Sequence, residues 1–137
     1  MYLEKIMGEP VITVGMDYSL ERVQDIFQQV NFHHLPVVES GKLQGLISDK
    51  ILFKSLSPYL NSPSEQARDI ATLNKKAHQI MEKDLFTLPP KAIIRDAIHV
   101  FNTQSIECIP IVEGGDLLVG ILSWRDIFKV IAKSQQK

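Results

Sequence analysis

The stretch LPVVESGKLQGLIS, residues 35–48, returns later in the chain as IPIVEGGDLLVGILS, residues 109–123. Pro36 and Pro110 are 74 positions apart, whereas Gly45 and Gly120 are 75 apart, so the second stretch has one extra residue in its turn. A change of one residue in a surface turn costs little free energy. The chain is therefore a tandem duplication, and both copies should fold alike.

Each copy begins with a pattern that predicts a short strand and then a helix. The strands are expected at 11–14 and 86–88. In the segment 20–30 apolar side chains recur at spacings of three and four, which predicts an amphipathic helix capped by Ser19. The segment 94–101 repeats this stripe. Both helices should place one face on a core.

The second half of each copy predicts a hairpin followed by a closing helix. In the first copy, strands at 35–38 and 43–47 flank a turn, and a helix follows at 50–56. In the second copy the closing helix is expected at 124–132. The fold class is thus α+β (α/β), with two pseudo-symmetric β-α-β-β-α repeats packed sheet to sheet, because neither repeat can cover its own sheet.

A segment without a counterpart separates the two repeats. The predicted organisation is a first repeat at 1–57, an inter-repeat helical insertion at 58–79 and a second repeat at 80–137. Ser62 followed three residues later by Glu65 is a capping-box pattern, which predicts that the helix of the insertion starts there. We expect this helix to pack on the module or on a partner subunit; the alternative is a disordered linker.

Composition excludes several classes of protein. A formal net charge of −1 without a long basic run argues against nucleic-acid binding. No apolar run is long enough to span a membrane and the N-terminus lacks a signal-peptide pattern, so a cytoplasmic location is expected. The single cysteine, Cys108, lies among isoleucines and should pack as a small hydrophobe. No catalytic motif is present, so the chain is predicted not to be an enzyme.

These duplicated stretches, and the leads Ile6-Met7 and Ile80-Met81, resemble a pair of CBS domains, often called a Bateman module. The resemblance covers nearly the whole chain apart from the insertion. It implies two pseudo-symmetric clefts between the repeats, often occupied by AMP, ATP, S-adenosylmethionine or a related adenosyl compound. It also implies a homodimer, and no cofactor beyond such a regulatory ligand.

The resemblance assigns a ribose-binding motif, G-h-h-[ST]-x-x-[DN], to the second repeat. There Gly120 would allow a close approach of the backbone, Ser123 would offer a hydroxyl, and Asp126 would accept hydrogen bonds from the ribose hydroxyls. The equivalent of Asp126 in the first repeat is Ile51, which cannot accept a hydrogen bond. Taken alone, S-x-x-D at a helix start is more often a cap than a ligand site.

The resemblance also implies that the first repeat completes the cleft that contains Asp126. His33 and His34 are adjacent, so in a strand they point to opposite faces and cannot share a metal, and no metal site is expected. A protonated histidine could instead meet phosphate. The other expected ligand-binding residues are Thr13, which could read the base, Phe32 and Pro36 of the same repeat, and Arg125 beside Asp126.

Two functions follow from these expectations. The first is a ligand sensor, in which an adenosyl compound changes the arrangement of the repeats and an unknown effector protein responds. The alternative is a ligand-free dimerisation or interaction module, suggested by Ile51 at the first ribose position. Trp124 fits either function, because it could stack on an adenine or lie in a dimer face.

Overall fold

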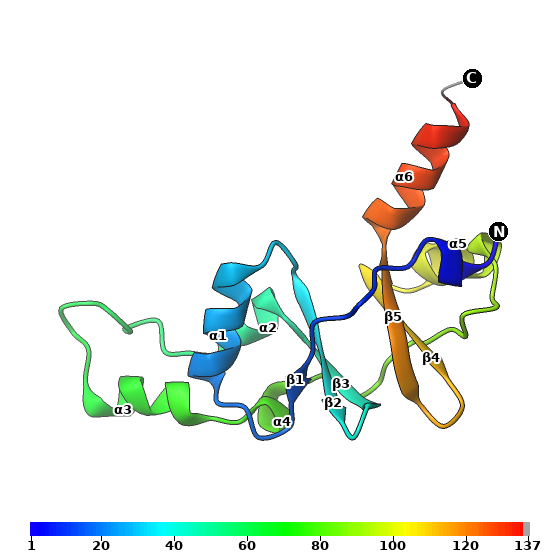
Figure 1. Cartoon of the computed structure of the whole chain (residues 1–137). Coiled ribbons are helices and arrows are strands. Elements are labelled where there is room, and N and C mark those ends of the chain that lie inside the picture. Colours follow the sequence, from blue (N-terminus) through cyan, green and yellow to red (C-terminus); the bar gives the residue numbers. More distant parts are fainter. Residues whose placement is uncertain (136–137) are drawn as a thin grey trace. The chain divides into compact units, whose positions relative to one another are not determined.

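The computed structural model describes residues 1–135, which form two compact units (Figure 1). Unit 1 contains Met1–Val11, Gly41–Leu43 and the described residues from Leu85 onward, and unit 2 contains Ile12–Ser40 and Gln44–Asp84. Each unit combines strands and helices, so the mixed α/β fold with two repeats is confirmed. The N-terminal segment of the chain therefore belongs to the unit built around the second repeat.

Unit 2 has the element order that the first repeat predicts. Ser19 caps α1 as expected, because its side chain accepts a hydrogen bond from the Arg22 amide at 3.2 Å. Strand β1 is shorter than the expected 11–14 and pairs in parallel with β2, with Val14 opposite Val37. The ladder stops there because the next residue of β2, Pro36, has no N–H to donate. The elements are β1 (Val14–Gly15), α1 (Leu20–Gln29), β2 (His34–Glu39), β3 (Lys42–Ser48) and α2 (Asp49–Ser55).

Unit 1 repeats this order with one difference. The strand expected at 86–88 is reduced to a parallel bridge between Leu88 and Ile111, since Pro89 and Pro90 follow at once and cannot donate to a ladder. The remaining elements are α5 (Ile94–Thr103), β4 (Cys108–Glu113), β5 (Leu117–Ser123) and α6 (Trp124–Ser134), preceded at the N-terminus by the short helix η1 (Leu3–Lys5). Cys108 is buried in β4, as predicted.

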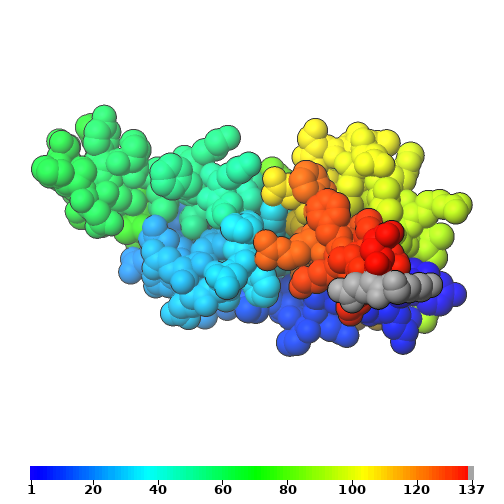
Figure 2. Space-filling model, turned by 90° about the horizontal axis from the view of Figure 1, so that it is seen from above, coloured from blue at the N-terminus to red at the C-terminus, as the bar shows by residue number. Residues whose placement is uncertain are grey.

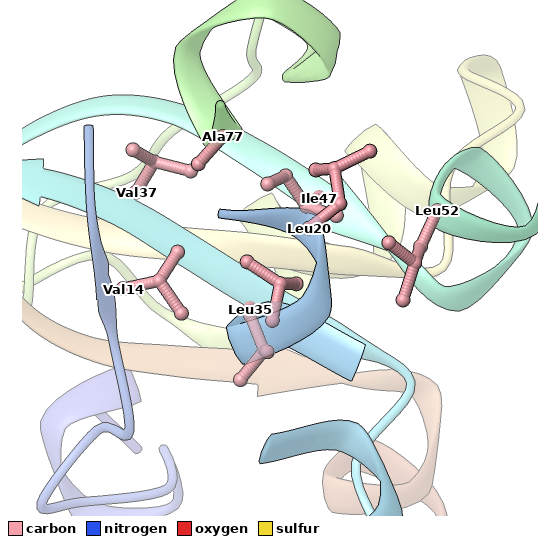
Figure 3. Close-up of a cluster of buried hydrophobic side chains, with 8 residues drawn as sticks. Val14, Leu20, Leu35, Val37, Ile47, Leu52 and Ala77 are labelled. Atoms are coloured by element: carbon pink, nitrogen blue, oxygen red, sulfur yellow. The ribbon is translucent and has the colours of Figure 1, made fainter. Parts of the chain in front are cut away.

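Each unit has its own hydrophobic core, and each core includes a residue from the lead of the other repeat. Figure 3 shows the core of unit 2, where Ala77 joins side chains of the first repeat. The core of unit 1 includes the fully buried Leu3. Each lead also forms the equivalent backbone hydrogen bond to the other repeat. The Ala77 amide donates to the Tyr18 carbonyl and the Leu3 amide to the Ala92 carbonyl, both at 2.8 Å. The two lead segments are therefore exchanged between the repeats.

The duplicated glycines of β3 and β5 allow the leads to pack closely. A Cβ atom on Gly45 would lie 2.6 Å from the Sδ atom of Met81 and 2.8 Å from the carbonyl oxygen of Glu82. On Gly120 it would overlap the Sδ atom of Met7. A side chain at either position would overlap the methionine where it now lies, so glycine gives the best fit where each lead crosses its strand.

The insertion contains helices, but the prediction that its helix starts at Ser62 is wrong. The helices are α3 (Ala67–Ala71), η2 (Thr72–Asn74) and α4 (Ala77–Ile80). Residues 62–65 form turns, in which the carboxylate of Glu65 accepts from the Asn61 amide at 2.6 Å instead of capping a helix. The helix begins where Asp69 accepts from the Gln66 amide at 2.8 Å.

Candidate ligand-binding site

The motif from Gly120 to Asp126 lies where β5 becomes α6. Ser123 is the last residue of β5, and its backbone N–H donates to Oδ2 of Asp126 at 2.8 Å. The Ser123 hydroxyl donates to the same oxygen at 3.2 Å. Asp126 thus has the geometry of a helix cap in this structure, and its negative charge is favoured at the N-terminus of α6.

The cap leaves part of the Asp126 carboxylate unused. Both hydrogen bonds go to Oδ2, and Oδ1 has no hydrogen-bond partner within residues 1–135. The side chain is partly exposed. A carboxylate offers about four acceptor positions, so this one can accept further donors such as a pair of hydroxyls without leaving the cap.

Gly120 lies against the N-terminal lead of unit 1. The space that a side chain would fill is occupied by Met7 of the N-terminal lead. The close approach that this glycine allows is therefore a contact between Gly120 and Met7, both in unit 1. Arg125, by contrast, is exposed on the first turn of α6 next to Asp126.

The expected residues of the first repeat gather around the start of β2 in unit 2. Phe32 is 54% exposed, and the exposed His33 places Nδ1 2.8 Å from Oδ2 of Asp49. The Asp49 amide also donates to the His33 carbonyl at 3.0 Å. His33 is thus held at the start of α2. Thr13 directly precedes β1, whereas Pro36 is fully buried and contributes to the shape of β2 rather than to the surface.

The structure therefore assembles the expected site residues as two groups, one in each unit. The group in unit 1 is Gly120, Ser123, Arg125 and Asp126, and the group in unit 2 is Thr13, Phe32, His33, His34 and Pro36. In unit 2 the position of Asp126 is taken by Ile51, whose amide donates to the Ser48 hydroxyl oxygen at 3.1 Å. The first repeat keeps the serine cap but has no carboxylate at this position.

A groove in unit 1 was not anticipated from the sequence. Its volume is about 440 Å³, and it is lined by the end of α5, by residues 104–107 and by Trp124. The rings of Phe101 and Trp124 meet edge to face, with centroids 6.3 Å apart and planes at 83°. None of the expected ligand-binding residues lines it. The sequence signal was the tryptophan at the start of α6, which allowed either stacking or a protein contact.

Neither a metal site nor a membrane-spanning helix is found within residues 1–135. No group of three or more histidine, cysteine or acidic side chains there could hold a metal ion. In the same part of the chain no helix is both long and apolar enough to cross a membrane.

Comparison with known families gives a match over most of the chain. The CBS domain model matches twice, at residues 3–58 and 77–133. The second match includes Ala77 and therefore reaches back into the end of the insertion.

Two similar proteins illustrate the range of lengths. The uncharacterized protein MJ1232 of Methanocaldococcus jannaschii is 26% identical over 122 residues, which are 89% of this chain but only 36% of that protein. The CBS domain-containing protein DDB_G0289609 of Dictyostelium discoideum is 23% identical over 133 residues, covering 96% of this chain and 91% of its own. This chain thus spans about a third of one relative and nearly all of the other.

A solved structure agrees with the fold. The CBS domain pair of protein MJ0100, in complex with 5′-methylthioadenosine and S-adenosyl-L-methionine, superposes with a TM-score of 0.79 at 22% identity, and 98% of each chain is covered. The two sequence matches and this fold agree with the duplication seen in the sequence. The chain belongs to the CBS domain family, as a tandem pair of CBS domains.

Proposed function

We propose that the chain is a regulatory module that binds an adenosyl compound, with AMP, ATP and S-adenosylmethionine as candidates. The observation that carries the proposal is the carboxylate of Asp126, which is fixed through Oδ2 and open at Oδ1. A carboxylate held in place can accept both hydroxyls of a ribose without a large loss of side-chain entropy. The complex of MJ0100 with two adenosyl compounds shows that a CBS pair of this fold can bind this class.

Further contacts are part of the same proposal. His33 and Arg125 are the exposed basic groups of the two site regions, and they would meet a phosphate or carboxylate of the ligand. Thr13 and Phe32 would contact the base. A ligand acts as a signal only if it binds two arrangements of the protein with different affinity, so we expect an effector protein to recognise one of them.

The test is thermal unfolding with AMP, ATP or S-adenosylmethionine. A ligand at a hundred times its Kd should add about 2.7 kcal/mol to the free energy of unfolding. Asp126→Ala should abolish this shift. Asp96→Ala is the matched control, because Asp96 also caps a helix of unit 1, accepting from the Ile93 amide at 3.0 Å, but lies outside the motif.

The control separates two roles of Asp126. Both variants should lower the midpoint of the free protein, because each loses a helix cap worth about 1 kcal/mol. Only Asp126→Ala should lose the response to ligand. Equal responses of both variants to a ligand would show that Asp126 is only a cap, and no response of the unmodified protein to any of the three would contradict the proposal.

Dimerisation without a ligand is the second candidate. Phe53 of α2 and Phe128 of α6 occupy equivalent positions of the two repeats and are 81% and 62% exposed. Exposed aromatic rings on both closing helices are typical of an interface between proteins. We propose that a homodimer forms through these helices. Sedimentation of the protein with and without nucleotides tests it, since a dimer that forms regardless of every nucleotide favours this function.

A further inference from the structure

The groove beside Trp124 in unit 1 has no role in the proposed function. Its volume is about 440 Å³, and the end of α5, residues 104–107 and Trp124 line this Trp124 groove. In Figure 2 the start of α6, in orange, lies beside the yellow atoms that include the end of α5. Within residues 1–135 the side chains that line the groove include no lysine, arginine or histidine, and Arg125 stays outside it. The groove therefore offers no basic group to a phosphate.

We propose that the Trp124 groove binds a small organic cation with a quaternary ammonium group, of which choline is the simplest probe. The site is separate from the proposed adenosyl site and lies within unit 1. Two aromatic rings, one carboxylate and the C-terminal end of a helix meet in it, and each of these attracts positive charge. A quaternary ammonium ion has no N–H to donate, so such groups bind it without hydrogen bonds.

The rings of Phe101 and Trp124 form an aromatic corner. Their planes are nearly perpendicular, at 83°, and their centroids are 6.3 Å apart. A cation beside both rings can lie within about 6 Å of each centroid, where it is attracted by the negative face of the ring. Trp124 is 46% exposed, so part of its ring is open to a ligand.

The charge of the groove comes from Glu107. This carboxylate is exposed, and among residues 1–135 it is the one charged side chain that lines the groove. In the same part of the chain no basic side chain forms an ion pair with it. A carboxylate that the protein does not neutralise attracts a cation and repels an anion. The groove should therefore prefer choline, which ends in a hydroxyl, to glycine betaine, which ends in a carboxylate.

The end of α5 adds to the same negative field. The last carbonyl groups of a helix lack partners within the helix and give its C-terminus a partial negative charge. The last turn of α5 contains no basic residue that would offset this charge, and its final residues line the groove. The side chains of Asn102, Gln104 and Ser105 line it too and can form hydrogen bonds with the hydroxyl of choline.

Fluorescence titration of the full chain with choline, at constant ionic strength, tests the proposal. The chain has one tryptophan, and it lines the groove, so its emission reports on this site. Choline should change the emission until the site is saturated. The neutral analogue dimethylbutanol, in which carbon replaces the charged nitrogen, should bind about tenfold more weakly, because it lacks the attraction between cation and ring. Glycine betaine should also bind more weakly than choline.

Two pairs of variants test the assigned groups. Glu107→Gln should reduce the preference for choline over glycine betaine, whereas Glu113→Gln, at an exposed carboxylate of β4 outside the groove, should leave it unchanged. Phe101→Leu keeps an apolar side chain but removes the aromatic face, and it should weaken choline binding about fivefold. Phe86→Leu, which changes a ring 44% exposed outside the groove, should not. Circular dichroism checks that each variant is folded.

Three outcomes would overturn the proposal. An emission that shows no saturable change with choline would remove the site. Equal binding of choline and dimethylbutanol would show that the groove selects an apolar shape and not a positive charge. A change of Trp124 emission with AMP but not with choline would place the base of an adenosyl compound, and not a cation, in the groove.

Discussion

At the scale of single residues, the two duplicated glycines should differ in how much stability is lost when each is replaced by alanine. The Cβ atom of an alanine at position 45 would meet the Glu82 carbonyl oxygen at 2.8 Å as well as the Met81 side chain, and backbone atoms cannot move aside easily. At position 120 it would meet Met7 side-chain atoms, which are flexible. Gly45→Ala should therefore cost about 3 kcal/mol and Gly120→Ala about 1 kcal/mol.

Urea unfolding of both variants checks this order. Gly8→Ala is the control, because a Cβ atom there would lie 3.6 Å from its nearest neighbour and should be tolerated. Met7→Ala removes the overlapping side chain, so Gly120→Ala should cost less when it is added to Met7→Ala than when it is made in the unmodified protein. Equal costs at positions 45 and 120 would contradict the assigned contacts.

A second prediction at this scale concerns the missing carboxylate of the first repeat. Ser48 already caps α2 by accepting from the amide of residue 51 at 3.1 Å, so Ile51→Asp recreates the motif of the second repeat. If only the missing carboxylate prevents the first repeat from binding, Ile51→Asp should bind two adenosyl ligands per chain, whereas the unmodified chain binds one. Calorimetric titration measures this stoichiometry. The double variant Ile51→Asp/Asp126→Ala should then bind one. A stoichiometry that stays at one in Ile51→Asp would contradict the prediction.

At the scale of elements, one aspartate fastens the insertion to the end of α2. Oδ1 of Asp69 accepts from the Ser57 hydroxyl at 2.7 Å and Oδ2 from the Gln66 amide at 2.8 Å, while the Asp69 carbonyl accepts from Thr72 Oγ1. The Ser57 hydroxyl above all, and then the Gln66 amide, hold the pKa of Asp69 below its ordinary value of 3.8. The charged form is thus the one that the fold stabilises.

The sign of the pH effect follows from that direction. A carboxyl whose pKa is lower in the folded than in the unfolded protein adds stability that is fully present above the unfolded value. This stability is lost as the pH falls from the unfolded value through the folded one. Asp69→Asn should lower the midpoint of thermal unfolding at pH 7 and differ less from the unmodified protein at pH 3. Asp84→Asn, at an exposed position, is the control, and a difference that grows on acidification would be the contrary result.

At the scale of the whole molecule, the exchange of leads makes the core of each unit depend on the lead of the other repeat. Leu3 is fully buried in the core of unit 1, with residues of the second repeat. Leu3→Ala should cost about 2–5 kcal/mol. The loss should appear as faster amide exchange in α5, β4 and β5, while the core strands of unit 2 keep their protection.

The matched substitution is at the equivalent position of the other lead. Ala77 is fully buried in the core of unit 2, so Ala77→Leu should overpack that core and reduce protection in β2 and β3 instead. If Leu3→Ala reduced protection in unit 2 first, the assignment of the leads would be wrong.

Much of the fold could be predicted from local patterns. The duplication, the two hairpins and the closing helices follow from spacings of two, three and four residues, and the cap at Ser19 follows from one side chain. These features depend on neighbours within about a turn of helix or along one strand, and local sequence describes such neighbours well. The Ser123-to-Asp126 hydrogen bonds belong to the same class, since three residues separate the partners.

Tertiary structure decided the rest. The packing of Leu3 and Ala77 in exchanged cores, the methionines over Gly45 and Gly120, and the groove between the end of α5 and Trp124 all join residues distant in sequence. Ser62 and Glu65 have the spacing of a capping box and predict a helix start at Ser62. In the structure Glu65 instead accepts a hydrogen bond from the Asn61 amide, and the helix starts at Ala67. By itself the sequence determined the repeated elements and the motif from Gly120 to Asp126. The packing of distant side chains determined which elements share a core, because burial of apolar surface and steric fit act between segments that no local pattern brings together.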